Sequence, residues 1–162
     1  MIRAAREGDA GAIGAIWNPI IRDTLVTFNP VEKTADDIVR LIAERGAAGH
    51  GFLVAEEADG IAGFASYGQF RAGAGYRGTM EHTIVLAPIA RGRGIGRALM
   101  GALEDHARDR GARSMFAGVS GENPAGRAFH ARLGYAEVAV LPAVGFKFGR
   151  WLDLVLMQKF LA

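Results

Sequence analysis

The sequence predicts an α/β fold in which a central mixed, mostly antiparallel sheet carries helices on both faces. The chain has 162 residues, which suits one domain with a core of its own. Three strand-like runs follow one another near the middle of the chain, which favours an antiparallel meander. Further on, strands alternate with helices, which favours a parallel pair. We therefore expect one continuous domain over residues 1–162.

The expected helices are indicated by their caps and by the spacing of apolar residues. Asp9 is placed to cap a first helix, with an apolar face at 13, 16, 17 and 20. Thr34 to Asp37 resembles a capping box before a second helix. A third helix is expected over 94–110. Asn123-Pro124 is a good start for a fourth helix, which ends at Gly134.

The expected strands are runs of β-branched, aromatic and other apolar residues between turns. After a short first strand over 2–4, they cover 52–55, 61–70, 79–86, 114–119, 135–140 and 152–160. Ala58-Asp59-Gly60 is a turn signal that joins the first long pair as a hairpin. The expected order is β-α-α-β-β-β-α-β-α-β-β.

Composition excludes several classes of function. The chain has no cysteine, which excludes disulfides, thiolate metal sites and a cysteine nucleophile. Its net charge of +2 argues against a general nucleic-acid binder, and no apolar run approaches the ~20 residues that span a bilayer. The first residues lack the pattern of a signal peptide. The four histidines are scattered, so no metal site is expected. We expect a cytoplasmic protein without nucleic-acid or membrane partners.

The clearest functional motif is a loop of glycine and arginine between the strand 79–86 and the following helix. It reads Arg91-Gly92-Arg93-Gly94-Ile95-Gly96 and is followed by Arg97. Glycines let backbone amides approach a ligand closely, a helix N-terminus favours negative charge, and arginines add full charges. The loop therefore predicts a pyrophosphate site, with a glycine-rich turn that binds nothing as the alternative. It fits neither the P-loop nor the dinucleotide fingerprint.

The spacing Arg-x-x-Gly-x-Gly resembles the pyrophosphate loop of the GNAT acetyltransferases, and the resemblance extends over essentially the whole chain. It is closest to the phosphinothricin / methionine sulfoximine N-acetyltransferase subfamily. The segments that carry it are Ala65–Gly68, Arg71, Gly78–Thr83, the loop, Gly121–Asn123, Phe129–Tyr135 and Val144–Asp153. The run Lys147-Phe148-Gly149-Arg150-Trp151-Leu152-Asp153 points to the subfamily. Thr27–Glu32 matches the family's substrate-side loop only loosely, which leaves the acceptor open.

The resemblance implies an acetyl-CoA-dependent N-acetyltransferase with the GNAT fold. Acetyl-CoA would be the co-substrate, and a small amino-acid-like amine would attack it directly through a tetrahedral intermediate. A homodimer is implied as well. In this fold the strand 79–86 splays from the next strand, so the backbone of Ile84, Val85 and Leu86 would pair with the pantetheine arm. The Val85 amide would also face the acetyl oxygen. Asn123 resembles a cofactor contact, although a helix cap explains it equally well.

Two residues are candidates for catalysis. Glu81, in the pattern Thr-x-Glu-His, would be the base that deprotonates the amine, with a solvated sheet face as the alternative. His130 stands where many GNAT proteins have a tyrosine that protonates the leaving thiolate, with a packed helix histidine as the alternative. His82 would point to the face opposite Glu81 and is expected to be structural.

The acceptor side is predicted from residue chemistry and from the resemblance. A guanidinium holds a carboxylate well, so Arg71 is the expected acceptor contact, with a solvated arginine as the alternative. Lys147 and Arg150 resemble residues near the acceptor pocket, in the same subunit or contributed across a dimer. Phe28 is a candidate wall of that pocket, although aromatic residues are more often core.

Two other functions stay open at this point. One is a GNAT enzyme that acts on a different amine, such as a protein N-terminus, a polyamine or an aminoglycoside. The other is a CoA-binding module without catalysis.

Overall fold

A seven-stranded sheet forms the centre of the structure, which is a computed structural model describing all residues from 1 to 162. In spatial order the strands are β1 (Ile2–Ala4), β2 (Phe52–Glu57), β3 (Gly60–Gln69), β4 (Thr79–Leu86), β5 (Ser114–Ser120), β7 (Arg150–Phe160) and β6 (Ala136–Lys147). Only the β4–β5 pair is parallel. The expected mixed, mostly antiparallel sheet is confirmed, including the parallel pair.

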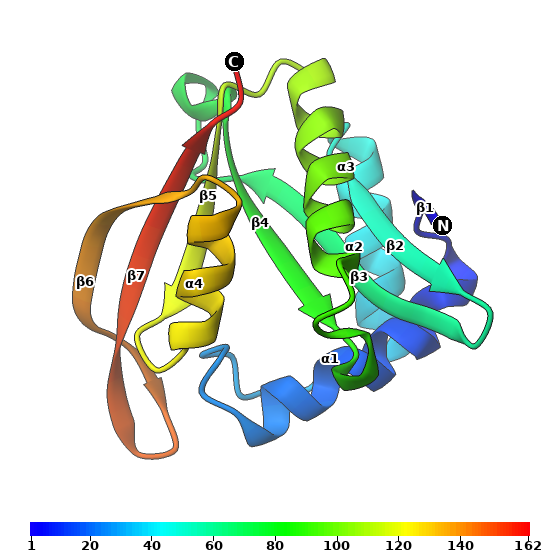
Figure 1. Cartoon of the computed structure of the whole chain (residues 1–162), viewed down its shortest axis with the longest axis horizontal. Coiled ribbons are helices and arrows are strands. Elements are labelled where there is room, and N and C mark those ends of the chain that lie inside the picture. Colours follow the sequence, from blue (N-terminus) through cyan, green and yellow to red (C-terminus); the bar gives the residue numbers. More distant parts are fainter.

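Helices cover both faces of this sheet, as predicted (Figure 1). On one face lie α1 (Ala10–Asp23) and α2 (Ala35–Ala47), and on the other lie α3 (Ile95–Asp109) and α4 (Pro124–Arg132). Short 3₁₀ turns at Glu7–Asp9, Ala74–Tyr76 and Pro88–Ala90 complete the elements. None of the helices has the combination of length and apolar character needed to cross a bilayer.

The core has two parts, one on each side of the sheet. Beneath α3, Leu99 and Leu103 are fully buried with Met115. On the other side, residues of α1 and α2 such as Ile13 and Ile38 pack against the central strands. Successive residues of a strand point to opposite faces, so strands buried on both sides are apolar at nearly every position. This explains why β3 and β5 read as continuous apolar runs.

The caps of α2 and α4 are confirmed, and that of α1 is wrong. The Thr34 hydroxyl accepts a hydrogen bond from the Asp37 amide, and the Asp37 carboxylate accepts one from the Thr34 amide. The Asn123 side chain accepts from the Gly126 amide. Asp9 precedes α1, but its carboxylate accepts from the Arg6 amide and is bound by both terminal nitrogens of Arg3 at 2.9 Å. These partners occupy both of its oxygens, so no cap forms.

The last two strands are longer than predicted. β6 continues to Lys147 rather than ending at Val140, because the pairing with β7 shifts register between Leu141 and Gly145 and then resumes. Ala143 adopts a φ of 52° within this irregular stretch. Pro142 and Gly145 indicate a strand end in the sequence, whereas in the structure they lie in a bulge that the strand passes through.

β4 and β5 separate halfway along their length. They pair from Thr79 with Ser114 to His82 with Ala117, and no pairing continues beyond that point. From Thr83 onward β4 is paired only with β3. Figure 1 shows the two strands diverging, with α4 beside the opening. The expected splay is confirmed, and it places an unpaired strand edge inside the sheet.

Candidate active site

Two adjoining cavities follow the opening between β4 and β5. The larger, of about 510 Å³, reaches from the end of β4 to the loop before α3 and the start of α4. The smaller, of about 300 Å³, lies between β4, β5 and the end of α1. The residues that line both are Ile20, Val26, Ile84, Val85, Asn123 and His130. The shared walls make the two cavities one continuous cleft.

The glycine and arginine loop forms the far end of the larger cavity. Gly92 and Gly94 have φ values of 74° and 83°, in the left-handed region that favours glycine. Nothing lies within 4 Å of where a Cβ would stand on either residue, so this side of the loop is open. Arg91 and Arg97 line the cavity. Backbone amides at a helix N-terminus, together with these guanidiniums, suit a pyrophosphate.

The other loop residues have different tasks. Arg93 turns away and forms an ion pair with Glu57 at 3.0 Å. Ile95 is partly buried against the larger core. A Cβ on Gly96 would lie 3.1 Å from the side chains of Leu86 and Phe129, so this glycine allows α3 to pack closely. The structure therefore brings Arg91, Gly92, Gly94 and Arg97 to the cavity, and it uses Arg93, Ile95 and Gly96 to hold the loop.

The wall of the cleft is formed by the unpaired part of β4. Ile84, Val85 and Leu86 line the larger cavity, while the Val85 side chain is buried in the core on the α1 side. The amides and carbonyls of Ile84 and Leu86 point to the opening, whereas those of Val85 point to β3, because Val85 pairs with Phe64 in the same register as the bonded pairs Ala62–Ala87 and Phe70–Thr79. Asn123 lines both cavities and also caps α4.

Glu81 faces the smaller cavity without any hydrogen-bond or ion-pair partner in the chain. A Cβ on Gly118 would stand 2.8 Å from Oε2 of Glu81, so the glycine makes room for the carboxylate. Burial raises the pKa of this carboxyl group. A half-buried carboxylate with a raised pKa and no cation beside it is a suitable proton acceptor.

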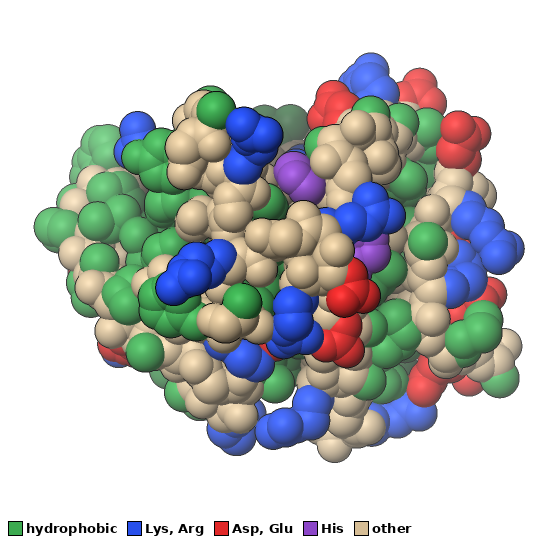
Figure 2. Space-filling view, turned by 90° about the horizontal axis from the view of Figure 1, so that it is seen from above, with side chains coloured by type: hydrophobic (Ala, Val, Ile, Leu, Met, Phe, Trp, Pro, Cys, Tyr) green, Lys and Arg blue, Asp and Glu red, His purple; other side chains and the backbone are tan.

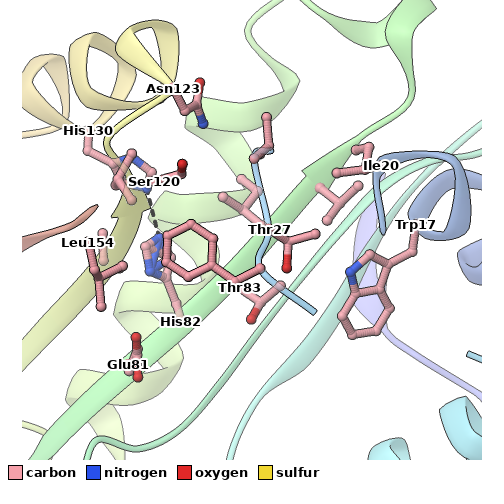
Figure 3. A pocket seen from close by; sticks show the side chains of 17 residues that line it. Trp17, Ile20, Thr27, Glu81, His82, Thr83, Ser120, Asn123, His130 and Leu154 are labelled. Carbon is pink, nitrogen blue, oxygen red and sulfur yellow. Dashed lines mark hydrogen bonds between the residues drawn. The ribbon is translucent and has the colours of Figure 1, made fainter. Parts of the chain in front are cut away.

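His82 points to the face opposite Glu81, as predicted, and meets His130 of α4 there (Figure 3). The two Nε2 atoms are 3.0 Å apart. Nδ1 of His82 lies 3.1 Å from the carbonyl oxygen of Phe116, and Nδ1 of His130 lies 2.7 Å from that of Gly126. Both rings are buried, yet both line the smaller cavity. The sequence did not indicate this contact, because it depends on how α4 crosses the sheet.

The acceptor-side segment after α1 closes the smaller cavity. Thr27 and Phe28 line it, together with Trp17 of α1. The Phe28 ring lies against the backbone of β6, where a Cβ on Gly145 would come within 2.3 Å of it. Phe28 therefore lines this cavity, and its role as a wall of the acceptor pocket stays a prediction.

Lys147 supports this segment from behind rather than lining the cavity. It is 2 % exposed, and its ammonium group donates to the carbonyl oxygens of Thr24 at 2.5 Å and Thr27 at 2.8 Å. Burial lowers the pKa of this lysine. Through Lys147, the β6–β7 hairpin fixes the backbone that presents Thr27 and Phe28 to the cleft.

Two predicted acceptor residues lie away from the cavity lining. Arg71 is exposed on the segment between β3 and β4, with its guanidinium 5.8 Å from the centroid of the Tyr76 ring. Arg150 is exposed and bonds Glu122 at 2.8 Å. The structure also contains no cluster of three or more histidine or acidic side chains that could hold a metal ion.

Residues 17–135 match the model of the acetyltransferase (GNAT) family. The chain belongs to the GNAT acetyltransferase family. It is 41% identical to L-amino acid N-acyltransferase MnaT of Escherichia coli, over 97% of this chain and 91% of that protein. It is 38% identical to L-methionine sulfoximine/L-methionine sulfone acetyltransferase of Salmonella typhimurium, over 97% and 92%.

The fold agrees with solved GNAT structures. A phosphinothricin acetyltransferase from Sinorhizobium meliloti, crystallised with acetyl-CoA, superposes with a TM-score of 0.93 and 31% identity over 99% of this chain and 87% of that one. This GNAT protein is thus an acetyl-CoA-dependent N-acetyltransferase. The open loop before α3, with its two unpaired guanidiniums and its glycine backbone, fits the pyrophosphate of that co-substrate.

Replacing Gly94 by valine in this GNAT enzyme should abolish tight acetyl-CoA binding. A β-branched residue is strained at a φ of 83° by about 1–3 kcal/mol, and its side chain would cover the loop amides. We expect the Kd for acetyl-CoA, measured by calorimetric titration, to rise at least roughly tenfold. Gly101→Val is the matched control, because Gly101 lies in α3 with open space around it. A folded Gly94→Val protein with unchanged affinity would mean that the loop does not hold the cofactor.

Proposed function

We propose that this enzyme, with the whole chain acting as one domain, acetylates the amine of a small amino-acid-like acceptor of the methionine sulfoximine, methionine sulfone or phosphinothricin type. The observation that carries the proposal is the position of Glu81 in the smaller cavity, directly beside the cofactor cavity. A volume of about 300 Å³ suits a small acceptor and leaves no room for a folded substrate. Relatives with 38–41% identity carry names with acceptors of this kind.

In the proposed reaction, Glu81 takes a proton from the acceptor's ammonium group, directly or through a water molecule. The freed amine attacks the thioester carbonyl carbon, and the electron pair of the C=O bond moves to the oxygen. The Ile84 amide is the proposed donor to that oxygen. The Val85 amide, which the sequence suggested, is turned toward β3: Val85 pairs with Phe64 in the same register as the bonded pairs Ala62–Ala87 and Phe70–Thr79. The C–S bond then breaks with its electron pair on sulfur, and the second proton of the attacking nitrogen passes through water to the thiolate, which leaves a neutral amide and the CoA thiol.

His130 is the second proposed catalytic residue. Both of its ring nitrogens are engaged, one with the Gly126 carbonyl and one with His82. Direct donation of a proton to the thiolate would require His130 to leave one of these contacts. While both contacts are intact, the proposed contribution of His130 is therefore electrostatic.

Glu81→Gln should lower kcat by about 10²- to 10⁴-fold while acetyl-CoA binding is retained, because the amide keeps the size and removes the basic site. The base works only when ionised, so the wild-type rate should rise as pH increases through the pKa of Glu81. Burial raises that pKa, so this limb should lie at higher pH than for an exposed glutamate. In Glu81→Gln the limb should disappear.

The pH profile should be read with acceptors of different amine pKa, so that ionisation of the acceptor is not mistaken for that of the enzyme. Glu137→Gln is the control, since Glu137 is exposed and bonded only to Arg127. A near-normal kcat in Glu81→Gln would remove Glu81 from the mechanism.

Arg71 is proposed to hold the acceptor's carboxylate, although in this structure it is exposed and stacked near Tyr76. Thiol release from acetyl-CoA should occur with α-amino acid acceptors and be much weaker with amines that lack the carboxylate. Arg71→Ala should remove this preference and raise the acceptor KM by roughly tenfold to a hundredfold, the value of one charged hydrogen-bond pair. The KM for acetyl-CoA should not change.

Arg77→Ala, an exposed arginine of the same segment, serves as the control for Arg71. Equal effects of Arg71→Ala on both substrates would assign Arg71 another task.

Turnover of polyamines or peptides, with amino acids inert, would favour the other GNAT function. Absence of thiol release with every amine would leave a CoA-binding module.

Lys147 and Arg150 are proposed as supports of the acceptor side.

A homodimer formed through the β6–β7 hairpin is the proposed assembly. Apolar side chains of this hairpin that are at least half exposed include Val138, Val140, Val144, Phe146, Phe148 and Trp151. Figure 2 shows hydrophobic side chains gathered at the end of the molecule where β6 and β7 lie. The exposed charged residues of the hairpin are Glu137, Arg150 and Asp153. An apolar patch at the edge of a sheet can be covered by a second copy of itself, and patches of this kind mark interfaces. The proposed location is the cytoplasm, since a chain without cysteine needs no oxidising compartment.

Light scattering coupled to size exclusion should give twice the mass of one chain at micromolar concentration. Phe146→Asp together with Trp151→Asp should give the mass of a monomer. Arg40→Asp is the control, because Arg40 is an exposed residue of α2 and lies outside the β6–β7 hairpin. This variant should leave the dimer intact. A monomeric wild-type protein would contradict this assembly.

A further inference from the structure

The contact between His82 and His130 requires more hydrogen atoms than two neutral rings possess. Carbonyl oxygens only accept hydrogen bonds, so the contacts with Phe116 and Gly126 require a hydrogen on both Nδ1 atoms. The two Nε2 atoms face each other at 3.0 Å, and this contact requires a third hydrogen. Two neutral imidazoles carry two. With two hydrogens only, one contact would bring two lone pairs together in a buried place, which is costly.

We propose that the His82–His130 pair holds one additional proton between its facing Nε2 atoms, so that a single positive charge is buried in the floor of the catalytic cleft. The pair keeps this proton during the reaction, and no atom passes from it to the substrates. The proton resides mainly on His130, and His82 accepts the hydrogen bond.

Burial and the partners of His130 act in opposite directions. Burial lowers the pKa of His130, whereas the hydrogen bond to the Gly126 carbonyl and the Glu104 carboxylate on α3 favour its charged form. Glu104 is itself bonded by the Tyr135 hydroxyl at 3.1 Å and by the Lys159 ammonium of β7 at 2.6 Å. Burial and the charge on His130 lower the pKa of His82 to about 3, so His82 stays neutral while His130 is charged.

The other elements around the pair bring no further charge to it. β5 contributes the carbonyl oxygen of Phe116, and on β4 the carboxylate of Glu81 is on the opposite face. The Tyr135 ring stacks on His82 with centroids 5.7 Å apart, and the Phe129 ring of α4 lies edge-on to His130. These aromatic rings shield the charge from water, so its field acts mainly toward the cleft.

The consequence for catalysis rests on the proposed function. Both rings line the smaller cavity, beside the strand that would carry the acetyl group. During transfer, negative charge develops first on the acetyl oxygen and then on sulfur, and a fixed positive charge nearby stabilises both. His130 acts through its charge. His82 is a positioning residue, because it acts by holding the proton and the ring of His130.

Nuclear magnetic resonance of protein labelled with ¹⁵N in its histidines tests the proton count directly. At pH 7 both Nδ1 atoms should carry hydrogen, and the two Nε2 atoms should share one proton with a low-field ¹H resonance, in opposition to the lowering of the His130 pKa by burial. At higher pH the pair should lose this proton in one step. Two neutral rings at pH 7, with one Nδ1 lacking hydrogen, would overturn the proposal. This measurement uses the unmodified protein and needs no activity.

His82→Gln tests the effect on the reaction. A glutamine amide can donate to a neutral His130 without the additional proton, while the Phe116 carbonyl loses the donor that Nδ1 of His82 supplies. We expect kcat to fall by about tenfold to a hundredfold, less than for loss of a direct oxyanion donor. The wild-type rate should fall at high pH as the pair loses its proton, and this alkaline limb should be absent in the variant. His50→Gln is the control, because the buried Nδ1 of His50 has no hydrogen-bond partner.

The outcomes separate the two proposals. A shared proton in the spectrum together with no amine acetylation would contradict the proposed function and leave the charged pair standing. Full activity with neutral rings would contradict the charged pair alone. A His82→Gln enzyme with the wild-type kcat and alkaline limb would also contradict it, since the charge would then have no effect on catalysis.

Discussion

The separation of β4 from β5 after His82 is the constraint on which the rest of the structure depends. Up to that point the strands pair as parallel neighbours, and beyond it the sheet is open along one edge of β4. An unpaired edge is normally found at the rim of a sheet, where other chains can add to it. Here it lies in the interior. The glycine and arginine loop continues from the same strand, so the opening and the proposed phosphate site come from one stretch of chain.

β4, the strand at this opening, presents an acidic side chain on one face of the sheet and a histidine on the other. Glu81 faces the side of α1, where its carboxylate has no partner, and His82 faces α4, where it meets His130. Because alternate residues point in opposite directions, the carboxylate of Glu81 and the imidazole of His82 occupy adjacent positions without contact between them. The proposed base and the proposed buried charge are kept apart in this way.

Local sequence rules predicted most of the fold and about half of the arrangement of the site. The capping box at Thr34, the cap at Asn123, the turn at Asp59-Gly60 and the alternation of β4 depend on neighbouring residues, and they were confirmed. The task of Lys147, the packing of Gly96 against Phe129, and the contact of His82 with His130 depend on segments distant in the sequence. Spacing carries no information about these contacts. Asp9 was misinterpreted for a related reason, since Arg3 from β1 competes for its carboxylate.

The interior opening also has a consequence for the cohesion of the protein. Strands β1 to β4 form one half of the sheet and β5, β7 and β6 the other, and only four residue pairs join the halves directly. An acetyl-CoA arm lying along β4 would take the place of missing ladder partners, and ligands that bind only the folded state stabilise it by mass action. The resistance of the chain to unfolding is therefore coupled to the supply of acetyl-CoA. When acetyl-CoA is scarce, the protein would separate more readily between β4 and β5.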